Sequence, residues 1–343
     1  MFGLFLSLSG MAKMITLFFV AFVLTGSVVV AQSTDKRSAE KIITRALIHA
    51  DTVTMLDLSG MEMDTLPDDI AKLKNLKILY LDENNFRTIP QVVFKLKNLE
   101  VLSMRGWGTF DDDTNHHLLT IVPSQIDKLT SLVELNLEKN NITDVPQEFA
   151  QLKSLRRLFL YGNGLSAAAV GGISRLYMLE VLDLSANNIT GLPASFSNLK
   201  NLKYLGLDNE WEEGCPVGDA MGFPNVLCSL TNLEVLSMQG QSIDSVPASI
   251  GNLKKLRMLD LYGNQFLYLP ESIGNLTELT SLNIGLLCLG NMLKLCDLQF
   301  YFPQSICNLQ KLKSFFFEGR SIAPKEMDRI KECLPKNLFK TEE

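Results

Sequence analysis

Residues 76–98 read LKILYLDENNFRTIPQVVFKLKN, and residues 132–154 read LVELNLEKNNITDVPQEFAQLKS. Both stretches begin Leu-x-x-Leu-x-Leu, place Asn at the ninth position and continue with Pro-x-x-apolar-x-x-Leu. The cassette restarts along the chain at Val53, Leu76, Leu99, Leu132, Leu155, Leu179, Leu202, Leu233, Leu256, Leu279 and Leu312, with spacings of 23, 23, 33, 23, 24, 23, 31, 23, 23 and 33 residues. One supersecondary unit is therefore repeated in series, ten times in full and once in part. We number these units 1 to 11.

The pattern within a unit predicts its local structure. Leu-x-Leu alternation has the period of a strand, so Leu79 and Leu81 face the stacked core while Tyr80 faces the other side. The Pro-x-x-apolar-x-x-Leu half has near-helical spacing, with proline suited to the first helical position. The recurring Asn is expected to bond buried turn backbone. These residues are Asn84, Asn140, Asn163, Asn187 and Asn264.

This cassette resembles the leucine-rich-repeat family, in particular its short Leu-Pro class, and residues 53–317 carry the resemblance. The resemblance implies an α/β fold, a right-handed curved solenoid or horseshoe. In that fold a parallel β-sheet lines the concave face, and short helices or 3-10 turns line the convex face. Members of this family mostly bind other macromolecules, so the resemblance also implies a protein-binding role.

The ends of the chain predict export and capping. Residues 14–31 are almost wholly apolar and follow Lys13, which is typical of a secretory signal peptide cleaved after Ala31. A retained membrane anchor is the alternative. We therefore divide the chain into a signal peptide (1–31), an N-terminal helical cap (32–52), repeats (53–317) and a C-terminal helical cap (318–343). The expected location is secreted, periplasmic or at the cell surface, in a bacterial-type protein.

Three units are longer than the others, by 10, 8 and 10 residues, and each insertion lies between the Asn position and Leu-Pro. The insertions should therefore leave the same edge of the sheet. In these units the Asn position holds Trp107, Glu210 or Leu287, so another group must satisfy the local backbone. Apolar side chains in the insertions are either contact anchors or small satellite cores folded onto the edge. They are Trp107, Phe110, Trp211, Met221, Phe223, Met292, Phe300, Tyr301 and Phe302.

Outward-facing strand positions predict a binding face rather than an idle solvated one. The aromatic members are Tyr80, Phe159, Tyr161, Tyr204 and Tyr262. The acidic members are Asp57, Asp82, Glu134, Glu138, Asp183, Asp208 and Asp260, with Arg105 and Arg157 as the cationic exceptions. Such a face suits a protein or peptide with some positive charge, or a glycan, and it disfavours nucleic acid because it repels phosphate. Together with Trp107 and Trp211, these positions are the candidate partner-binding residues.

All six cysteines lie in the C-terminal part of the chain, at 215, 228, 288, 296, 307 and 333. An even number in an exported chain suggests disulfides. The parallel placement of Cys215 with Cys228 predicts a bridge between these two, and the other four would form two more. The alternative is that Cys228 and Cys307 are small buried thiols, because their position holds Ala, Ser or Gly in other units.

No pattern for catalysis, a cofactor or a metal stands out. The sequence lacks Gly-x-Ser-x-Gly, a phosphate-binding Gly-rich loop and His-Glu-x-x-His. Asp111–Asp113 with His116 and His117 are more simply a solvated loop than a cation site. A net charge of −6, with 46% hydrophobic residues, fits an ordinary folded chain.

We therefore expect a non-enzymatic, exported binding scaffold with no cofactor and no membrane span after signal cleavage. One alternative is a structural surface protein that associates with itself. The other is a relative of effector ubiquitin ligases that lacks their catalytic domain.

Overall fold

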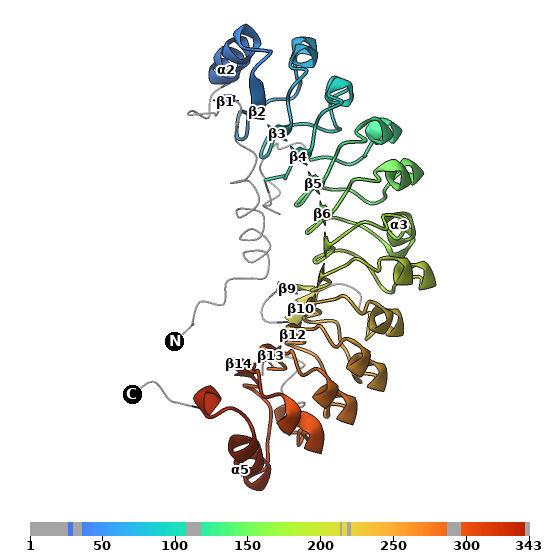
Figure 1. The fold of residues 1–343 in the computed structure, drawn as a ribbon, viewed down its shortest axis with the longest axis vertical. Coiled ribbons are helices and arrows are strands. Elements are labelled where there is room, and N and C mark those ends of the chain that lie inside the picture. Colours follow the sequence, from blue (N-terminus) through green and yellow to red (C-terminus); the bar gives the residue numbers. More distant parts are fainter. Residues whose placement is uncertain are drawn as a thin grey trace.

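The computed structural model describes residues 27–29, 36–107, 118–212, 215–217, 221–286 and 296–339, and it places side chains from residue 39 onward except at 210–212 and 215–217. The chain forms an open curved solenoid in which strands line the inner side of the arc and short helical turns line the outer side (Figure 1). The predicted horseshoe is confirmed.

Within the described residues, twelve strands form one parallel sheet whose spatial order follows the chain. The strands are β1 (Ser27–Val29), β2 (Val53–Asp57), β3 (Ile78–Tyr80), β4 (Val101–Ser103), β5 (Glu134–Asn136), β6 (Arg157–Phe159), β7 (Val181–Asp183), β8 (Tyr204–Gly206), β11 (Val235–Ser237), β12 (Met258–Asp260), β13 (Ser281–Asn283) and β14 (Ser314–Phe316). A separate antiparallel hairpin joins β9 (Glu210–Glu212) to β10 (Cys215–Val217).

The register of the sheet places equivalent residues of successive units side by side. Leu56 pairs with Leu79, and Leu79 pairs with Leu102. These leucines are fully buried, as are most repeat leucines, in one core that runs through the solenoid. Burying each such side chain contributes roughly 1.5 to 3 kcal/mol. Each unit therefore obtains most of its stability from its two neighbours.

The convex side consists mainly of short 3-10 turns. They are η1 (Asp68–Lys72), η2 (Val93–Lys95), η3 (Ser124–Lys128), η4 (Gln147–Gln151), η5 (Ala194–Asn198), η6 (Asn225–Ser229), η7 (Ala248–Asn252), η8 (Glu271–Asn275) and η10 (Gln304–Asn308). The prediction that proline takes the first helical position is wrong for most turns. Pro146, for example, is the N-cap of η4, with an extended backbone at φ −66° and ψ 151°. Proline fixes φ but leaves ψ free, so it can end the extended segment one residue before the turn.

Unit 5 differs from its neighbours because an α-helix, α3 (Ala167–Ile173), replaces the 3-10 turn. The segment has no proline at the turn entry and contains three consecutive alanines, which have the highest helix propensity. Ala169, Val170 and Ile173 are its buried residues, so the longer helix still packs on the common core.

The predicted role of the recurring Asn is confirmed. Asn84 Nδ2 donates to the carbonyl oxygens of Leu58 at 2.9 Å and Leu81 at 3.0 Å, and Asn84 Oδ1 accepts from Met63 N at 2.8 Å. Each such Asn therefore satisfies the turn backbone of the preceding unit as well as its own. The same arrangement recurs at Asn140, Asn163, Asn187 and Asn264.

Helices lie at both ends of the arc. Helix α2 (Lys36–Ile48) precedes β2, and helix α5 (Pro324–Cys333), followed by the turn η11 (Lys336–Phe339), succeeds β14 (Figure 1). Strand β1 lies inside the segment that we predict to be a signal peptide, and it pairs with β2 at the edge of the sheet. The predicted cleavage after Ala31 would remove this strand and leave β2 as the edge. In the described part of the chain, no helix has the length and apolar character needed to cross a bilayer.

Candidate binding surface

The concave face of the sheet carries three columns of side chains. The first column follows the start of each strand and consists of Met55, Ile78, Val101, Glu134, Arg157, Val181, Tyr204, Val235, Met258, Ser281 and Ser314. The second column consists of Asp57, Tyr80, Ser103, Asn136, Phe159, Asp183, Gly206, Ser237, Asp260, Asn283 and Phe316. The third column lies two residues further on and includes Asp82, Arg105, Glu138, Tyr161, Ser185, Asp208, Gln239 and Tyr262.

The predicted aromatic stripe is only partly open to a partner. Phe159 and Tyr204 are 4% and 3% exposed, because they pack with Val181 in a cluster that is separate from the main core. Val235 and Met258 are half-buried and pack against this cluster. The remaining members, Tyr80, Tyr161 and Tyr262, are also half-buried. The side chains at the centre of the face thus form a lateral apolar patch rather than a row of free rings.

Both predicted cationic residues are paired with carboxylates of this chain. Arg157 Nε lies 2.6 Å from Glu134 Oε2, and their side chains are only 14% and 6% exposed. Arg105 forms an ion pair with Glu83. The positive charge on this face is therefore largely neutralised from within, which leaves its electrostatic character acidic.

The second-column carboxylates and amides close a local turn. Asp183 Oδ1 accepts from Ser185 N at 3.0 Å, and Asp260 Oδ1 accepts from Tyr262 N at 3.1 Å. The same bond to the N–H two residues later is made by Asp57, Asn136 and Asn283. A backbone donor at the end of each of these strands is satisfied in this way. These residues consequently have a structural role besides any role in binding.

Where the second column holds Ser, an acid from the previous unit satisfies the same donor. Asp208 Oδ1 accepts from Ser237 Oγ at 2.5 Å and from Gln239 N at 2.8 Å. Asp82 Oδ1 accepts from Ser103 Oγ at 2.5 Å and from Arg105 N at 2.8 Å. This role of Asp82 and Asp208 was not predicted from the sequence. Its signal is Ser-Met-x-Gly, at 103–106 and 237–240, one unit after a third-column Asp.

Burial changes the acidity of these groups. Burial raises the pKa of Asp208 to about 7, with a further increase from the negative charge of Asp260. Burial also raises the pKa of Asp260 to about 6, and it raises the pKa of Asp183. The pKa of Asp82 is raised by burial too, but nearby Arg105 opposes the rise. Within the residues that the structure describes, no ion pair joins Asp183, Asp208 or Asp260 to a basic side chain.

A side chain from the following unit fastens the base of each insertion. After the first insertion, Asn140 donates to Met104 O at 2.9 Å and accepts from Leu119 N at 3.0 Å. After the second, Gln241 donates to Leu207 O at 2.6 Å and accepts from Met221 N at 3.2 Å. These two side chains bond backbone on both sides of the insertion. The longer units lack their own Asn, and the side-chain amides of Asn140 and Gln241 bond the turn backbone in its place.

Arg320 takes this position after the third insertion. Its guanidinium donates to the carbonyl oxygens of Ile284, Phe266 and Asn264, each at 2.8 Å, and lies 4.7 Å from the ring centre of Phe266. Burial lowers its pKa to about 10. The planar five-donor group suits a site that offers several carbonyl acceptors.

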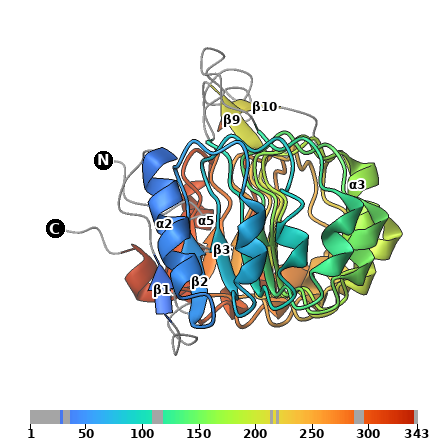
Figure 2. The same ribbon diagram turned by 90° about the horizontal axis from the view of Figure 1, so that it is seen from above.

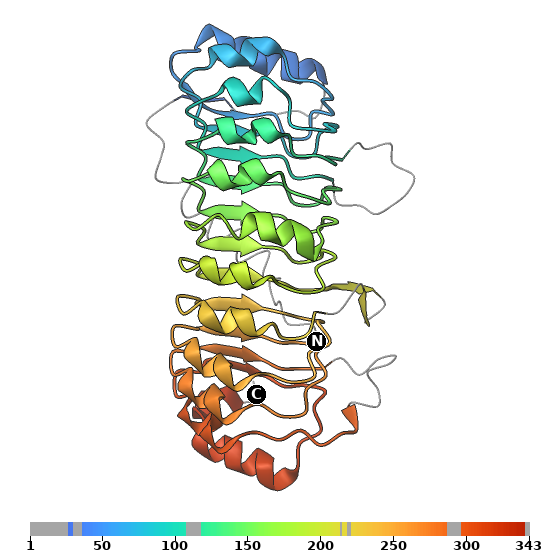
Figure 3. The same ribbon diagram turned by 90° about the vertical axis from the view of Figure 1, so that its right-hand side faces the viewer.

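The predicted anchors in the insertions divide into two groups. Phe300 and Phe302 are buried and make edge-to-face contacts with Phe266, Phe315 and Phe317. These two side chains fold back onto the solenoid as predicted by the second alternative, but they join its main core and do not form a separate satellite core. Tyr301 is exposed, and Trp107 is half-buried. The β9–β10 hairpin of the second insertion projects from the edge of the sheet (Figures 2 and 3). The side chain of Trp211 and residues Phe110, Asp111–Asp113, His116, His117 and Met292 lie outside the described residues.

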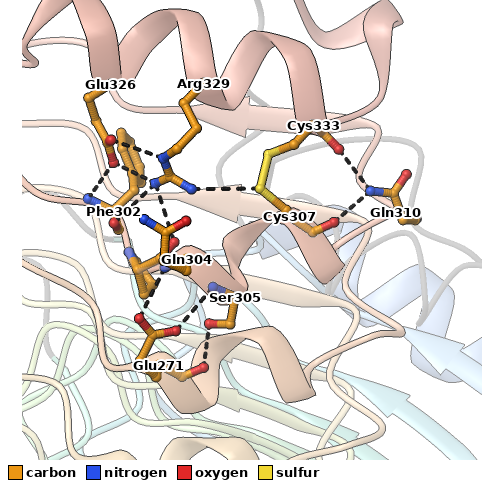
Figure 4. Close-up of a disulfide and its surroundings, with 10 residues drawn as sticks. Glu271, Phe302, Gln304, Ser305, Cys307, Gln310, Glu326, Arg329 and Cys333 are labelled. Atoms are coloured by element: carbon orange, nitrogen blue, oxygen red, sulfur yellow. Dashed lines mark hydrogen bonds and ion pairs between the residues drawn. A yellow bond between two sulfur atoms is a disulfide. The ribbon is translucent and has the colours of Figure 1, made fainter.

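The cysteines differ from the predicted pairing. Cys307 of η10 is bonded to Cys333 of α5 (Figure 4), and Cys296 is also disulfide-bonded. Cys228 is a free buried thiol, so the predicted Cys215–Cys228 bridge is wrong. Cys228 lies on η6, inside the convex stack, where burial raises its pKa and Ser249 of the next turn bonds it. The equivalent Cys307 lies on the last turn, which faces α5 instead. Cys288 and the side chain of Cys215 lie outside the described residues.

Comparisons with known proteins agree with this architecture. The model of a leucine-rich repeat region matches residues 52–164 and 213–334, and that of a leucine rich repeat matches 163–210. A probable serine/threonine-protein kinase, pats1, of Dictyostelium discoideum is 35% identical over 117 residues, which are 33% of this chain and 4% of that protein. The flightless-1 homolog of Caenorhabditis elegans is 29% identical over 108 residues, 32% of this chain and 8% of that protein. The match thus spans a small fraction of these relatives.

Among solved structures, a Leptospira interrogans leucine-rich-repeat protein has 25% identity and a TM-score of 0.60, covering 88% of this chain and 86% of that one. An internalin from Listeria monocytogenes has 22% identity and a TM-score of 0.63, covering 85% and 81%. The Arabidopsis receptor kinase HAESA, in complex with the peptide hormone IDA and the co-receptor SERK1, has 24% identity and a TM-score of 0.59, covering 81% and 44%. The last two likenesses are of fold alone.

Proposed function

Because this chain belongs to the leucine-rich-repeat family, we propose that it is an exported, non-enzymatic scaffold that binds a protein partner through its concave face. The observation that carries this proposal is the composition of the second and third columns together with the apolar patch. Half-buried aromatic rings at Tyr161 and Tyr262 share the third column with Glu138 and Asp208, and half-buried Val235 and Met258 lie in the first column of the same face. Aromatic and apolar groups surrounded by polar ones are typical of protein interfaces.

The geometry of the arc favours a macromolecular partner over a small molecule. The concave sheet presents the same three positions in successive units along the whole arc (Figure 1). The β9–β10 hairpin projects beyond one edge of that surface, where a partner bound on the concave face can contact it (Figure 2). Within the described residues, no group of His, Cys, Asp or Glu side chains is arranged to hold a metal ion.

Export is supported by two features. The N-terminal segment has the basic and apolar pattern of a signal peptide. The Cys307–Cys333 disulfide is of the kind that persists in oxidising compartments. Both features fit a protein that is secreted, periplasmic or at the cell surface.

The test is crosslinking mass spectrometry of tagged protein in its own cells. We expect the double variant Tyr161→Ala with Tyr262→Ala to lose the partners of the wild type, because removing an interface anchor costs about 1 to 2 kcal/mol, or roughly tenfold in affinity, per residue. The matched control is Tyr177→Ala, an exposed tyrosine next to the convex helix α3. An unchanged set of partners in the double variant, with its fold intact by circular dichroism, would reject the concave face as the binding site.

A further inference from the structure

The C-terminal half of the concave face combines apolar surface with acids that lack a countercharge. Met258 and Val235 lie half-buried in the first column, beside Tyr204. Asp260 lies on the strand of Met258, two residues further on, and its Oδ2 accepts from Gln239 Nε2 at 3.1 Å. Asp208 lies one unit before Gln239, in the same third column. We call this set the Asp208 surface, and it consists of Asp208, Val235, Gln239, Met258 and Asp260, with buried Tyr204 packed beside Val235.

Acidic residues in the two halves of the concave face differ in whether a basic side chain lies near them. In the N-terminal half, Glu134 is paired with Arg157, and Asp82 lies near Arg105. In the C-terminal half, the position equivalent to Arg105 holds Gln239, and in the described ranges no basic side chain forms an ion pair with Asp208 or Asp260. Burying a carboxylate without a cation is costly. The high pKa values of Asp208 and Asp260 express this cost.

An incoming cation would lower that cost only if the neighbouring apolar surface is covered at the same time, because water would otherwise screen the interaction. The spacing fits a polypeptide. Met258 and Asp260 lie two residues apart on one strand, or about 7 Å, which equals the distance between same-facing side chains of an extended chain.

We propose that the Asp208 surface binds a linear segment of a partner protein that carries a lysine or arginine two residues from an apolar side chain. The basic side chain contacts the carboxylates of Asp208 and Asp260, and the apolar side chain contacts Val235 and Met258. This inference rests on the proposed function and specifies its partner.

The structure provides a matched pair of variants for the test. Asp208 and Asp82 occupy equivalent positions and accept the same two bonds, from a Ser hydroxyl and a backbone N–H. Asn at either position keeps an oxygen acceptor for these bonds and removes the charge. Only the variant Asp208→Asn removes an acid that lacks a countercharge. Asp82 lies at the other end of the concave face, five strands from Asp208 and outside the Asp208 surface, so the proposed peptide does not contact it and Asp82→Asn is the control.

The experiment uses the full chain as bait for a phage-displayed library of random linear 12-residue peptides. We expect the wild type to enrich peptides with Lys or Arg two positions from Leu, Ile, Met, Val or Phe. The best synthetic peptide should bind Asp208→Asn at least tenfold more weakly and Asp82→Asn within twofold of the wild type. Enrichment of acidic or uncharged peptides, no enrichment, or equal weakening by both variants would each overturn the inference.

Its failure is distinguishable from failure of the proposed function. If the peptide result is negative but the double variant of Tyr161 and Tyr262 still loses the crosslinked partners, the concave face binds a partner of different chemistry. If both results are negative, the proposed binding face itself is wrong.

Discussion

The sulfur atoms of Cys307 and Cys333 are bonded, which joins the last full turn of the solenoid to helix α5 (Figure 4). Polar contacts surround this bond. Gln310 Nε2 donates to the carbonyl oxygens of Cys307 at 2.6 Å and Cys333 at 2.9 Å, and Arg329 donates to Phe302 O at 3.1 Å. The C-terminal helix is therefore fastened to the repeats covalently and by hydrogen bonds, and it covers the end of the apolar core.

Replacing Cys333 by Ser should loosen this cap. The disulfide closes a segment with a sequence separation of 26, and chain entropy predicts a loss of about 3.5 kcal/mol without it. Compared with the wild type, we expect Cys333→Ser to have a lower urea midpoint. Its amide exchange should become faster in α5 and change less in the central units. The control is Cys228→Ser, which changes a free thiol and should cost less than about 1.5 kcal/mol. Equal exchange in α5 of Cys333→Ser and the wild type would contradict this role.

Arg320 should be among the most sensitive single residues. The variant Arg320→Ala leaves three carbonyl oxygens without their donor, and we expect a loss of about 3 kcal/mol in the free energy of unfolding, measured in urea. The variant Arg320→Gln should cost less, because Gln241 makes the equivalent bond to Leu207 O in unit 8. If Ala and Gln are equally destabilising, the donated bonds are not the reason for Arg at this position.

Gly206 should not tolerate a methyl group. A Cβ atom there would lie 2.6 Å from Asp183 Oδ1 and 2.9 Å from Ser185 Oγ. Both oxygens accept backbone hydrogen bonds, from Ser185 N and Asp208 N respectively. We expect Gly206→Ala to destabilise the protein by about 1 to 3 kcal/mol in thermal or urea unfolding. At Gly191 a Cβ atom would have no neighbour within 4 Å, so Gly191→Ala is the control and should be neutral or slightly stabilising. Similar losses in both variants would point to backbone effects instead of this contact.

Stability should fall as the pH rises from about 4 to about 7. Asp208 has a pKa of about 7 in the folded protein and near 3.9 when unfolded, so in this interval the folded state binds the additional proton. The groups that face it are Asp183 and Asp260, whose charges act in the same direction, and the donors Ser237 and Gln239.

We therefore expect the free energy of unfolding to be about 1 to 3 kcal/mol larger at pH 5 than at pH 8, which should appear as a higher melting temperature at pH 5. Asp208→Asn should reduce this difference, whereas Asp82→Asn should reduce it less, because Arg105 offsets the charge of Asp82. A melting temperature that rises between pH 5 and pH 8 would show that Asp208 is ionised without cost in the fold.

The spacing of Leu76, Leu79, Leu81 and Asn84 was sufficient to predict the strand, the turn and the register of the sheet. A unit with that pattern can bury its leucines only against copies of itself. In a solenoid, the local sequence pattern therefore determines the overall fold. The carbonyls that Asn bonds are likewise fixed by that repeat, because the preceding unit always presents them at the same position.

The repeat pattern did not determine which side chains of the concave face and the convex turns are exposed, nor what they contact. Sequence placed Tyr204 and Phe159 on the concave side correctly, but only lateral packing between strands shows that they are buried against Val181. In the same way, Cys228 and Cys307 occupy equivalent positions, yet one meets another turn and the other meets α5. Repeat register is set by contacts within and between adjacent units. The environment of a side chain depends on which neighbours the curvature and the ends of the solenoid bring to it, and that is decided only in three dimensions.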